Sequence, residues 1–261
     1  MKRHLVALLL PAAMLVVAGA ELPETGPVPP EKPAPEEPAP NDDPGAGKEL
    51  SGKRIPDAGT EPPAGPPKPE IQAPEPELAE LKTCEAELER LGVVYEREEA
   101  IIGENGCGIV APYSISSIAK GVAISPATSM RCATALSLAR WVSDVVIPST
   151  AAFPDDIRLS EISHGSTYVC RRRNNSPTGK MSEHSIGNAV DVMGFGFEGR
   201  EPIPVSPRAG DGTMEEAFQR AVRAGACLHF TTVLGPGSDS NHNDHLHLDI
   251  IERRSGYRLC Q

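Results

Sequence analysis

The sequence predicts a disulfide-stabilised α+β domain at residues 78–261, in which helices flank a small, mostly antiparallel sheet. Two observations support this fold class. Segments with helical periodicity alternate with short β-prone segments, and all six cysteines lie after residue 80. An even number of cysteines behind an export signal predicts up to three disulfides.

Three segments are expected to be helical. Leucines at helical spacing from Leu78 to Leu91, among charged residues, predict an amphipathic helix that ends at Gly92. The pair Ser125-Pro126 is typical of an N-cap and first helical position, and the apolar content up to Val146 favours a central buried helix. A further helix is expected near residues 213–226.

Strands are expected where short apolar and β-branched segments lie between turn residues. These segments are Ile157–Ile162, Tyr168–Cys170, Ala189–Phe197, Phe230–Leu234 and His245–Ile251. The six cysteines allow 15 pairings, and their spacing does not choose among them. The pairing we expect joins Cys84 to Cys107, Cys132 to Cys227 and Cys170 to Cys260. A cysteine metal site is disfavoured because no two cysteines have the close spacing of zinc ribbons.

The N-terminal residues 1–20 are typical of a secretory signal peptide. Lys2 and Arg3 precede an apolar run over residues 5–17, and the small residues 18–20 offer a cleavage site. The run is shorter than the roughly 20 apolar residues of a transmembrane helix. We therefore expect a mature protein without a membrane span, in the periplasm or cell envelope.

Residues 21–77 have the composition of a disordered linker. They hold 17 of the 27 prolines, with 13 acidic and five basic residues and no aromatic residue. Such a segment cannot bury a core, so we expect an acidic, partly polyproline spacer. The overall net charge of −11 and the lack of a basic face exclude a typical nucleic-acid binder.

Two segments carry the candidate chemistry. In the first, over residues 182–191, the Gly187-Asn188 turn is expected to fold His184 back beside Asp191. The second, over residues 242–251, alternates apolar and polar residues as a strand does. Its core-facing residues would be Leu246, Leu248 and Ile250, and its opposite face would carry His245, His247 and Asp249.

Together the two segments supply the ligands of a catalytic zinc site, namely imidazoles and one carboxylate, with a fourth position for water. The alternative for the second segment alone is a polar strand face that binds no metal.

The motifs Ser182-x-His184-x-x-Gly187-x-Ala189-x-Asp191 and His245-x-His247 resemble those of the zinc DD-peptidase and murein endopeptidase superfamily, which includes the hedgehog domain. With the neighbouring motifs, the sequence over about residues 80–261 most closely resembles the bacterial extensin-like C-terminal domain. Those further motifs are Tyr168-x-Cys170-Arg171, Val233-Leu234-Gly235-Pro236-Gly237 and His242-x-x-His245-x-His247-x-Asp249. The resemblance implies a hedgehog/DD-peptidase-like fold.

The resemblance also implies roles for individual residues. His184, Asp191 and His247 would hold Zn²⁺, and His245 would be the catalytic base or stabilise the transition state. Arg171 would polarise the scissile carbonyl or bind a substrate carboxylate, although Arg172 and Arg173 compete for this role.

Other residues near the motifs have weaker assignments. Asp249 is expected to orient His247 by accepting the proton of its second ring nitrogen. Ser182 and His242 are expected to contact substrate. Asp244 and Glu183 remain alternative bases. His164 and His229 are expected to be structural.

These expectations favour a zinc metallopeptidase of the DD-carboxypeptidase or endopeptidase type, acting on peptidoglycan peptides or cross-links. The alternative is a non-catalytic, zinc-containing module that binds the cell wall or organises the envelope. The proline-rich segment suits either function as a spacer.

Overall fold

The computed structural model describes residues 78–154 and 156–261. The predicted signal peptide and the proline-rich segment, residues 1–77, lie outside the described part of the chain. Within that part, no helix is both long and apolar enough to cross a membrane.

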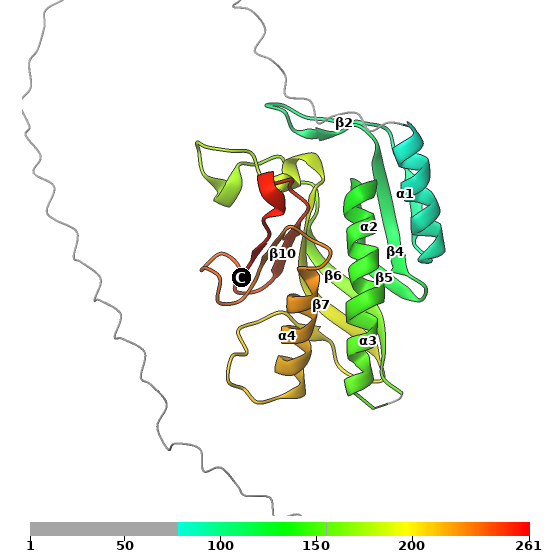
Figure 1. Cartoon of the computed structure of the whole chain (residues 1–261), viewed down its shortest axis with the longest axis vertical. Helices are drawn as coiled ribbons and strands as arrows, with labels where there is room; N and C mark the ends of the chain where they lie inside the picture. The colour runs from blue at the N-terminus through cyan, green and yellow to red at the C-terminus, as the bar shows by residue number, and fades with distance from the viewer. Residues whose placement is uncertain (1–77, 155) are drawn as a thin grey trace, which may run out of the picture. The chain divides into compact units, whose positions relative to one another are not determined.

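Most of the described strands join one nine-stranded mixed sheet, in the order β1-β4-β5-β6-β7-β10-β9-β11, with β8 paired to β7 (Figure 1). The pairs β5–β6 and β9–β11 are parallel and the others are antiparallel. The predicted α+β class with a mostly antiparallel sheet is therefore confirmed, although the sheet is larger than expected. The strands are Val94–Arg97 (β1), Pro112–Ala119 (β4), Val122–Arg131 (β5), Arg158–Ser166 (β6), Ala189–Glu198 (β7), Ile203–Pro204 (β8), Thr232–Leu234 (β9), Leu246–Asp249 (β10) and Leu259–Cys260 (β11), and Ile101–Ile102 (β2) pairs separately with Gly108–Ile109 (β3).

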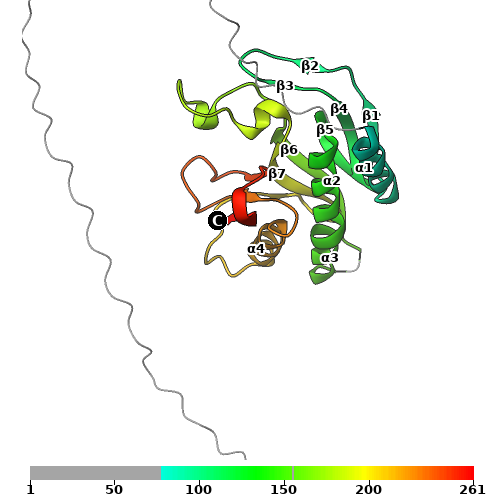
Figure 2. The ribbon, with the colours of Figure 1, turned by 45° about the horizontal axis from the view of Figure 1, so that its top comes forward.

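Helices α1, α2 and α4 lie over one face of this sheet (Figures 1 and 2). The helical segments are Leu78–Arg90 (α1), Cys132–Trp141 (α2), the π-helical Val142–Val146 (η1), Ile147–Ser149 (α3), Met214–Ala226 (α4) and the 3₁₀ turns Thr150–Ala152 (η2), Arg173–Asn175 (η3), Glu183–Ile186 (η4) and Arg254–Gly256 (η5).

The core lies between the sheet and these helices. Trp141 is fully buried there, packs edge-on against Phe195 and Phe230, and donates its indole N–H to the Val222 carbonyl at 2.8 Å. This contact ties α2, α4 and β7 into one unit.

The predicted first helix is confirmed, and it ends at Arg90 before Gly92, whose φ is +76°. The predicted helix near 213–226 is also confirmed. Thr213 is its N-cap and accepts a hydrogen bond from the Glu216 N–H at 3.2 Å.

Two of the predicted elements are wrong. Ser125-Pro126 does not start a helix but lies within β5, and α2 begins at Cys132. Proline lacks the N–H that a strand ladder uses, and the β5–β6 pairing accordingly ends at Ser125. No strand forms over 168–170, because β6 ends at Ser166 and the following residues turn toward η3.

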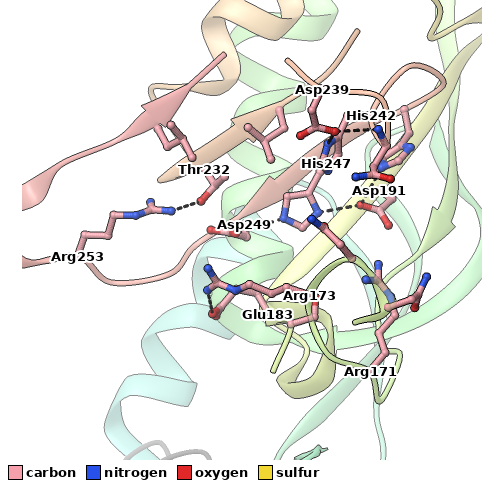
Figure 3. Close-up of a pocket in the computed structure, with 17 residues that line it drawn as sticks. Arg171, Arg173, Glu183, Asp191, Thr232, Asp239, His242, His247, Asp249 and Arg253 are labelled. Atoms are coloured by element: carbon pink, nitrogen blue, oxygen red, sulfur yellow. Dashed lines mark hydrogen bonds and ion pairs between the residues drawn. The ribbon is translucent and has the colours of Figure 1, made fainter. Parts of the chain in front are cut away.

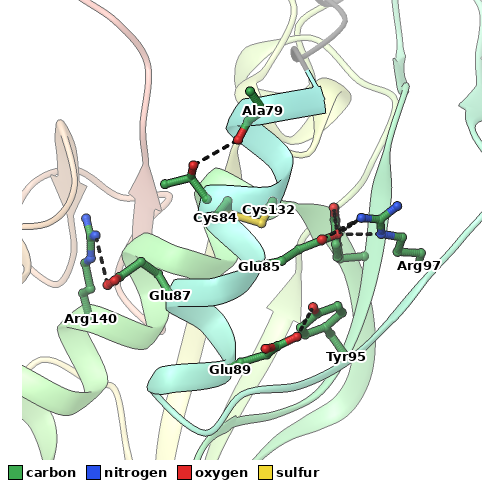
Figure 4. The surroundings of a disulfide bond; sticks show 11 residues. Ala79, Cys84, Glu85, Glu87, Glu89, Tyr95, Arg97, Cys132 and Arg140 are labelled. Atoms are coloured by element: carbon green, nitrogen blue, oxygen red, sulfur yellow. Dashed lines mark hydrogen bonds and ion pairs between the residues drawn. A yellow bond between two sulfur atoms is a disulfide. The ribbon is translucent and has the colours of Figure 1, made fainter.

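The expected disulfide pairing is wrong as well. The structure joins Cys84 to Cys132, Cys107 to Cys170 and Cys227 to Cys260. The first of these links α1 to the start of α2, which packs beside it (Figure 4). The pairing follows from which elements pack together, and cysteine spacing carries no information on that packing.

Candidate metal centre

Strands β7 and β10 present the first two residues of the candidate metal centre. They pair antiparallel, with His247 directly opposite Asp191. Leu246 and Leu248 are fully buried in the core. His247 and Asp249 therefore point to the opposite face of the sheet, where they line a cavity of about 440 Å³. The face alternation predicted for this strand is confirmed for its residues from 246 to 249.

The third residue, His184, comes from the short helix η4. That helix ends at Gly187, which adopts a left-handed conformation with φ of +69°. A side chain at this glycine would also approach Ile109 to 2.5 Å. The turn folds the chain back so that His184, with no exposed surface, lies 3.1 Å from Asp191 between its Nε2 and the carboxylate Oδ1. The predicted proximity of His184 and Asp191 is thus confirmed.

The three side chains bring one ligand atom each to a common point. His184 Nε2, His247 Nδ1 and Asp191 Oδ1 form a triangle with sides of 3.1, 3.1 and 2.9 Å. Tetrahedral ligands at about 2.0–2.1 Å from zinc would be about 3.3–3.4 Å apart. The triangle is only slightly tighter than that, and two imidazoles with one carboxylate suit zinc better than magnesium or calcium. The residues therefore fit a zinc ion.

Each of these three side chains also uses its other polar atom to bind the protein. His184 Nδ1 contacts the Thr167 carbonyl at 3.0 Å, so this nitrogen carries the proton and Nε2 can offer a lone pair. The Ser166 hydroxyl donates to Asp191 Oδ2 at 2.7 Å, and His247 Nε2 lies 3.2 Å from Asp249 Oδ2. The arrangement orients all three ligand atoms, as the partners of metal ligands commonly do.

The same contacts shift the pKa values of the cluster. Burial disfavours the charged form of Asp191, but its contacts with His184 and His247 outweigh burial and hold the pKa of this carboxyl far below its ordinary value. Burial also opposes the charged form of His247, yet its bonds to Asp191 and Asp249 raise its pKa to about 9. A proton therefore occupies this cluster at neutral pH when no cation does.

His245 stands beside the triangle. Its Nε2 lies 3.7 Å from Asp191 Oδ1, and its Nδ1 lies 2.8 Å from Asp244. Asp244 supports the His245 ring from the solvent side, and 75 % of the Asp244 side chain is exposed. Because an ionised Asp244 accepts a hydrogen bond from the Nδ1–H of His245, Nε2 of this ring is left as the basic atom on the cavity side.

The two residues expected to contact substrate also line the cavity (Figure 3). His242 is buried, and its Nδ1 lies 2.7 Å from Asp239. Its ring centre is 5.2 Å from that of His245. Ser182 is buried at the start of η4, where its carbonyl accepts a hydrogen bond from the Ser185 hydroxyl.

The structure separates the three candidate arginines. Arg172 donates to the Gly179 carbonyl and does not line the cavity, whereas Arg171 and Arg173 do. Arg173 forms an ion pair with Glu183 at 3.5 Å. Among the described residues, the Arg171 side chain has no hydrogen bond or ion pair, so its guanidinium is available to a ligand.

The remaining candidates lie in other settings. Glu183 lines the cavity but binds Asn188 and Arg173, which leaves it poorly placed as a base. His164 contacts the Pro126 carbonyl at 2.7 Å, and His229 lies 3.8 Å from Asp144. Neither of these two histidines lines the cavity.

Several residues of the centre have no counterpart among the sequence expectations. Ser166 and the Thr167 carbonyl support the ligands, Asp239 supports His242, and Thr232 and Arg253 line the cavity beyond Asp249. Their only sequence signal is polarity at strand ends and in loops, which is too common to single them out without knowledge of the strand pairing.

Comparison with known proteins gives one match. A family model described as "Extensin-like protein C-terminus" matches residues 82–261. No curated protein and no solved structure matches the chain.

Proposed function

The chain belongs to the extensin-like C-terminus family, and we propose that its folded domain is a zinc-dependent peptidase acting on peptidoglycan peptides or cross-links in the periplasm. The proposal depends above all on one observation. The ligand atoms of His184, Asp191 and His247 all lie within 4.8 Å of one another, and two of these residues, Asp191 and His247, line an open cavity while His184 is fully buried beside them. A structural polar cluster would have no need of three converging ligand atoms beside a space that is accessible to substrate.

A zinc ion held there would act as a Lewis acid that polarises a carbonyl oxygen and lowers the pKa of water to about 7. The protein supplies the proton acceptor. His245 Nε2 faces the ligand triangle from one side, and Asp244 holds the opposite ring nitrogen. His245 is therefore placed to take a proton from the attacking water and return it to the leaving amine.

Arg171 and His242 provide the substrate contacts of the proposal. The guanidinium of Arg171 can donate two parallel hydrogen bonds to a carboxylate or one to a peptide carbonyl. His242, held by Asp239, faces the same cavity from the loop before β10.

The location and substrate class have separate support. The sequence motifs resemble those of the zinc DD-peptidase and murein endopeptidase superfamily, and residues 1–20 have the composition of an export signal. An exported peptidase meets peptidoglycan as its most abundant peptide polymer. Zn²⁺ is accordingly the proposed cofactor, and peptidoglycan the proposed partner.

The test is to incubate the zinc-loaded protein with purified sacculi and analyse the soluble products by mass spectrometry. We expect new stem-peptide fragments, absent with the His245→Ala variant loaded with the same amount of zinc. A wild-type protein that binds zinc and pellets with sacculi but releases nothing would refute the peptidase and favour the wall-binding module. A protein that binds no zinc at micromolar concentrations would refute both.

A further inference from the structure

A line of polar residues leads from the candidate metal centre to the edge of the sheet. Its first member is Asp249, which lies 3.2 Å from His247 between Oδ2 and Nε2. Its second is Thr232 on β9, directly opposite Asp249 in the antiparallel pair and 97 % buried, since only 3 % of its surface is exposed. Burial raises the pKa of the Asp249 carboxyl, but its contacts with His247 and Thr232 lower it below the ordinary value.

Arg253 completes this line (Figure 3). Its Nη2 donates to the Thr232 hydroxyl at 2.6 Å, and its Nη1 donates to the Thr231 carbonyl at 2.6 Å. Two short bonds to adjacent residues, one just before β9 and one at its start, fix the plane of the guanidinium. The arginine is half-buried beside the cavity rather than extended into solvent.

The chemistry of these groups sets the direction of every hydrogen bond in the line. A guanidinium only donates, so the Thr232 oxygen must accept from Arg253. The single proton of that hydroxyl is then free to point at Asp249. Asp249 also accepts the Ile251 N–H on Oδ1 at 3.1 Å, which leaves Oδ2 as the acceptor for His247.

This direction matters for the ring of His247. If Asp249 accepts, then Nε2 of His247 carries a proton, and the lone pair of the neutral ring is on Nδ1. Nδ1 is the atom that lies 3.1 Å from His184 Nε2 and 2.9 Å from Asp191 Oδ1. The contacts that begin at Arg253 thereby select the His247 tautomer that can bind a cation, although Arg253 is three side chains away from that ring.

We propose that Thr232 and Arg253 are positioning residues that hold His247 in the tautomer and orientation required of a metal ligand. The inference rests on the proposed function only in taking His247 as a ligand. Neither residue contacts the ligand triangle, so both act through Asp249.

The first experiment reads the tautomer without metal. Ring ¹⁵N chemical shifts of His247 are recorded by NMR in the metal-free protein above about pH 9, where this ring is neutral. We expect a proton on Nε2 in the wild type and a mixture of tautomers in Thr232→Val and Arg253→Met. Thr232→Ser keeps the hydroxyl and should retain the wild-type spectrum. Arg254→Met, at the exposed neighbouring position, is the matched control.

The second experiment measures zinc affinity by competition with a chelator. Thr232→Val and Arg253→Met should bind zinc about 10- to 100-fold more weakly, as for other supports of metal ligands. Thr232→Ser and Arg254→Met should match the wild type.

The two experiments separate this inference from the proposed function. A wild type that binds no zinc would end the proposed function, while the NMR experiment would still test the tautomer. Unchanged ring shifts in folded Thr232→Val, or in Arg253→Met if the buried valine prevents folding, would overturn the positioning role. Wild-type zinc affinity in that same variant would overturn it too.

Discussion

His247 lies directly opposite Asp191 in the β10–β7 pair, with 2.9 Å between its Nδ1 and the carboxylate Oδ1. Directly opposed residues in an antiparallel pair have the closest side chains in a sheet. Main-chain hydrogen bonds therefore fix the distance between two of the three candidate ligands. The third, His184, depends on the turn at Gly187.

His247→Ala should abolish zinc binding, because two remaining ligands cannot hold the ion tightly in competition with water. His242→Ala should retain zinc, since its ring lies beside the triangle but contributes no atom to it. Metal content after dialysis against micromolar zinc checks both variants. Loss of zinc from His242→Ala alone would contradict the ligand set.

His245→Ala should keep zinc but lower kcat on peptidoglycan fragments by about 10²- to 10⁴-fold, the usual contribution of a general base. Asp244→Asn should have a smaller effect, because Asp244 is largely exposed and only supports the ring. Turnover and metal content are measured on the same samples. Full activity of zinc-loaded His245→Ala would move the base to another residue.

Ser166→Ala should weaken zinc binding by about 10- to 100-fold, because the hydroxyl orients Asp191 through its Oδ2 at 2.7 Å. Ser163→Ala, earlier on the same strand, is the control and should bind zinc normally. Chelator competition gives both affinities. Equal affinities for the two variants would show that Asp191 needs no such support.

The metal-free protein should lose stability as the pH rises from about 6.5 to about 9. Burial opposes the charged form of His247, but bonds to Asp191 and Asp249 raise its pKa from 6.5 to about 9. The folded chain thus holds one more proton than the unfolded chain in this range. The stability that this extra proton contributes is complete below pH 6.5 and is lost as the pH rises through 9. The free energy of unfolding then falls by at most ~1.4 kcal/mol per pH unit. Urea unfolding at several pH values measures it, and metal-free His247→Ala should lack this slope.

Zinc affinity should show the opposite pH dependence. The cation must displace the proton of His247, so apparent affinity should rise about tenfold per pH unit and level off near pH 9. Chelator competition across this range gives the slope. An affinity independent of pH would mean that His247 is not a ligand.

Removal of the Cys107–Cys170 disulfide should weaken substrate binding more than zinc binding. Cys170 precedes Arg171, and this bond closes a separation of 63 residues. Loop-closure entropy predicts a loss of up to about 4 kcal/mol in stability. The double serine variant should raise KM with zinc affinity unchanged. The Cys84–Cys132 double variant, remote from the cavity, should lose similar stability without the rise in KM.

The sequence could predict those parts of the fold and site that are encoded locally. Helix α4 has its N-cap Thr213, and β10 has a strict alternation that separates His247 from the core. The turn at Gly187 likewise brings His184 back to Asp191 over seven residues.

The parts that could not be predicted depend on contacts between distant segments. The disulfide pairing follows from packing, for example of α1 on α2. Thr232 supports Asp249 only because β9 pairs with β10 in one register. The sequence around Pro126 does not distinguish a helix start from a strand, because a serine-proline pair is compatible with an N-cap and also with an interruption of a strand ladder.

The register of β10 against β7 has a practical consequence for protein engineering. All three candidate donors come from two short segments, 184–191 and 246–249, joined by ladder bonds. A one-residue deletion within β10 would turn His247 toward the hydrophobic core and remove it from the metal centre. A transplant of these two segments onto an antiparallel pair in another protein would also need the supports that Ser166 and the Thr167 carbonyl give to Asp191 and His184.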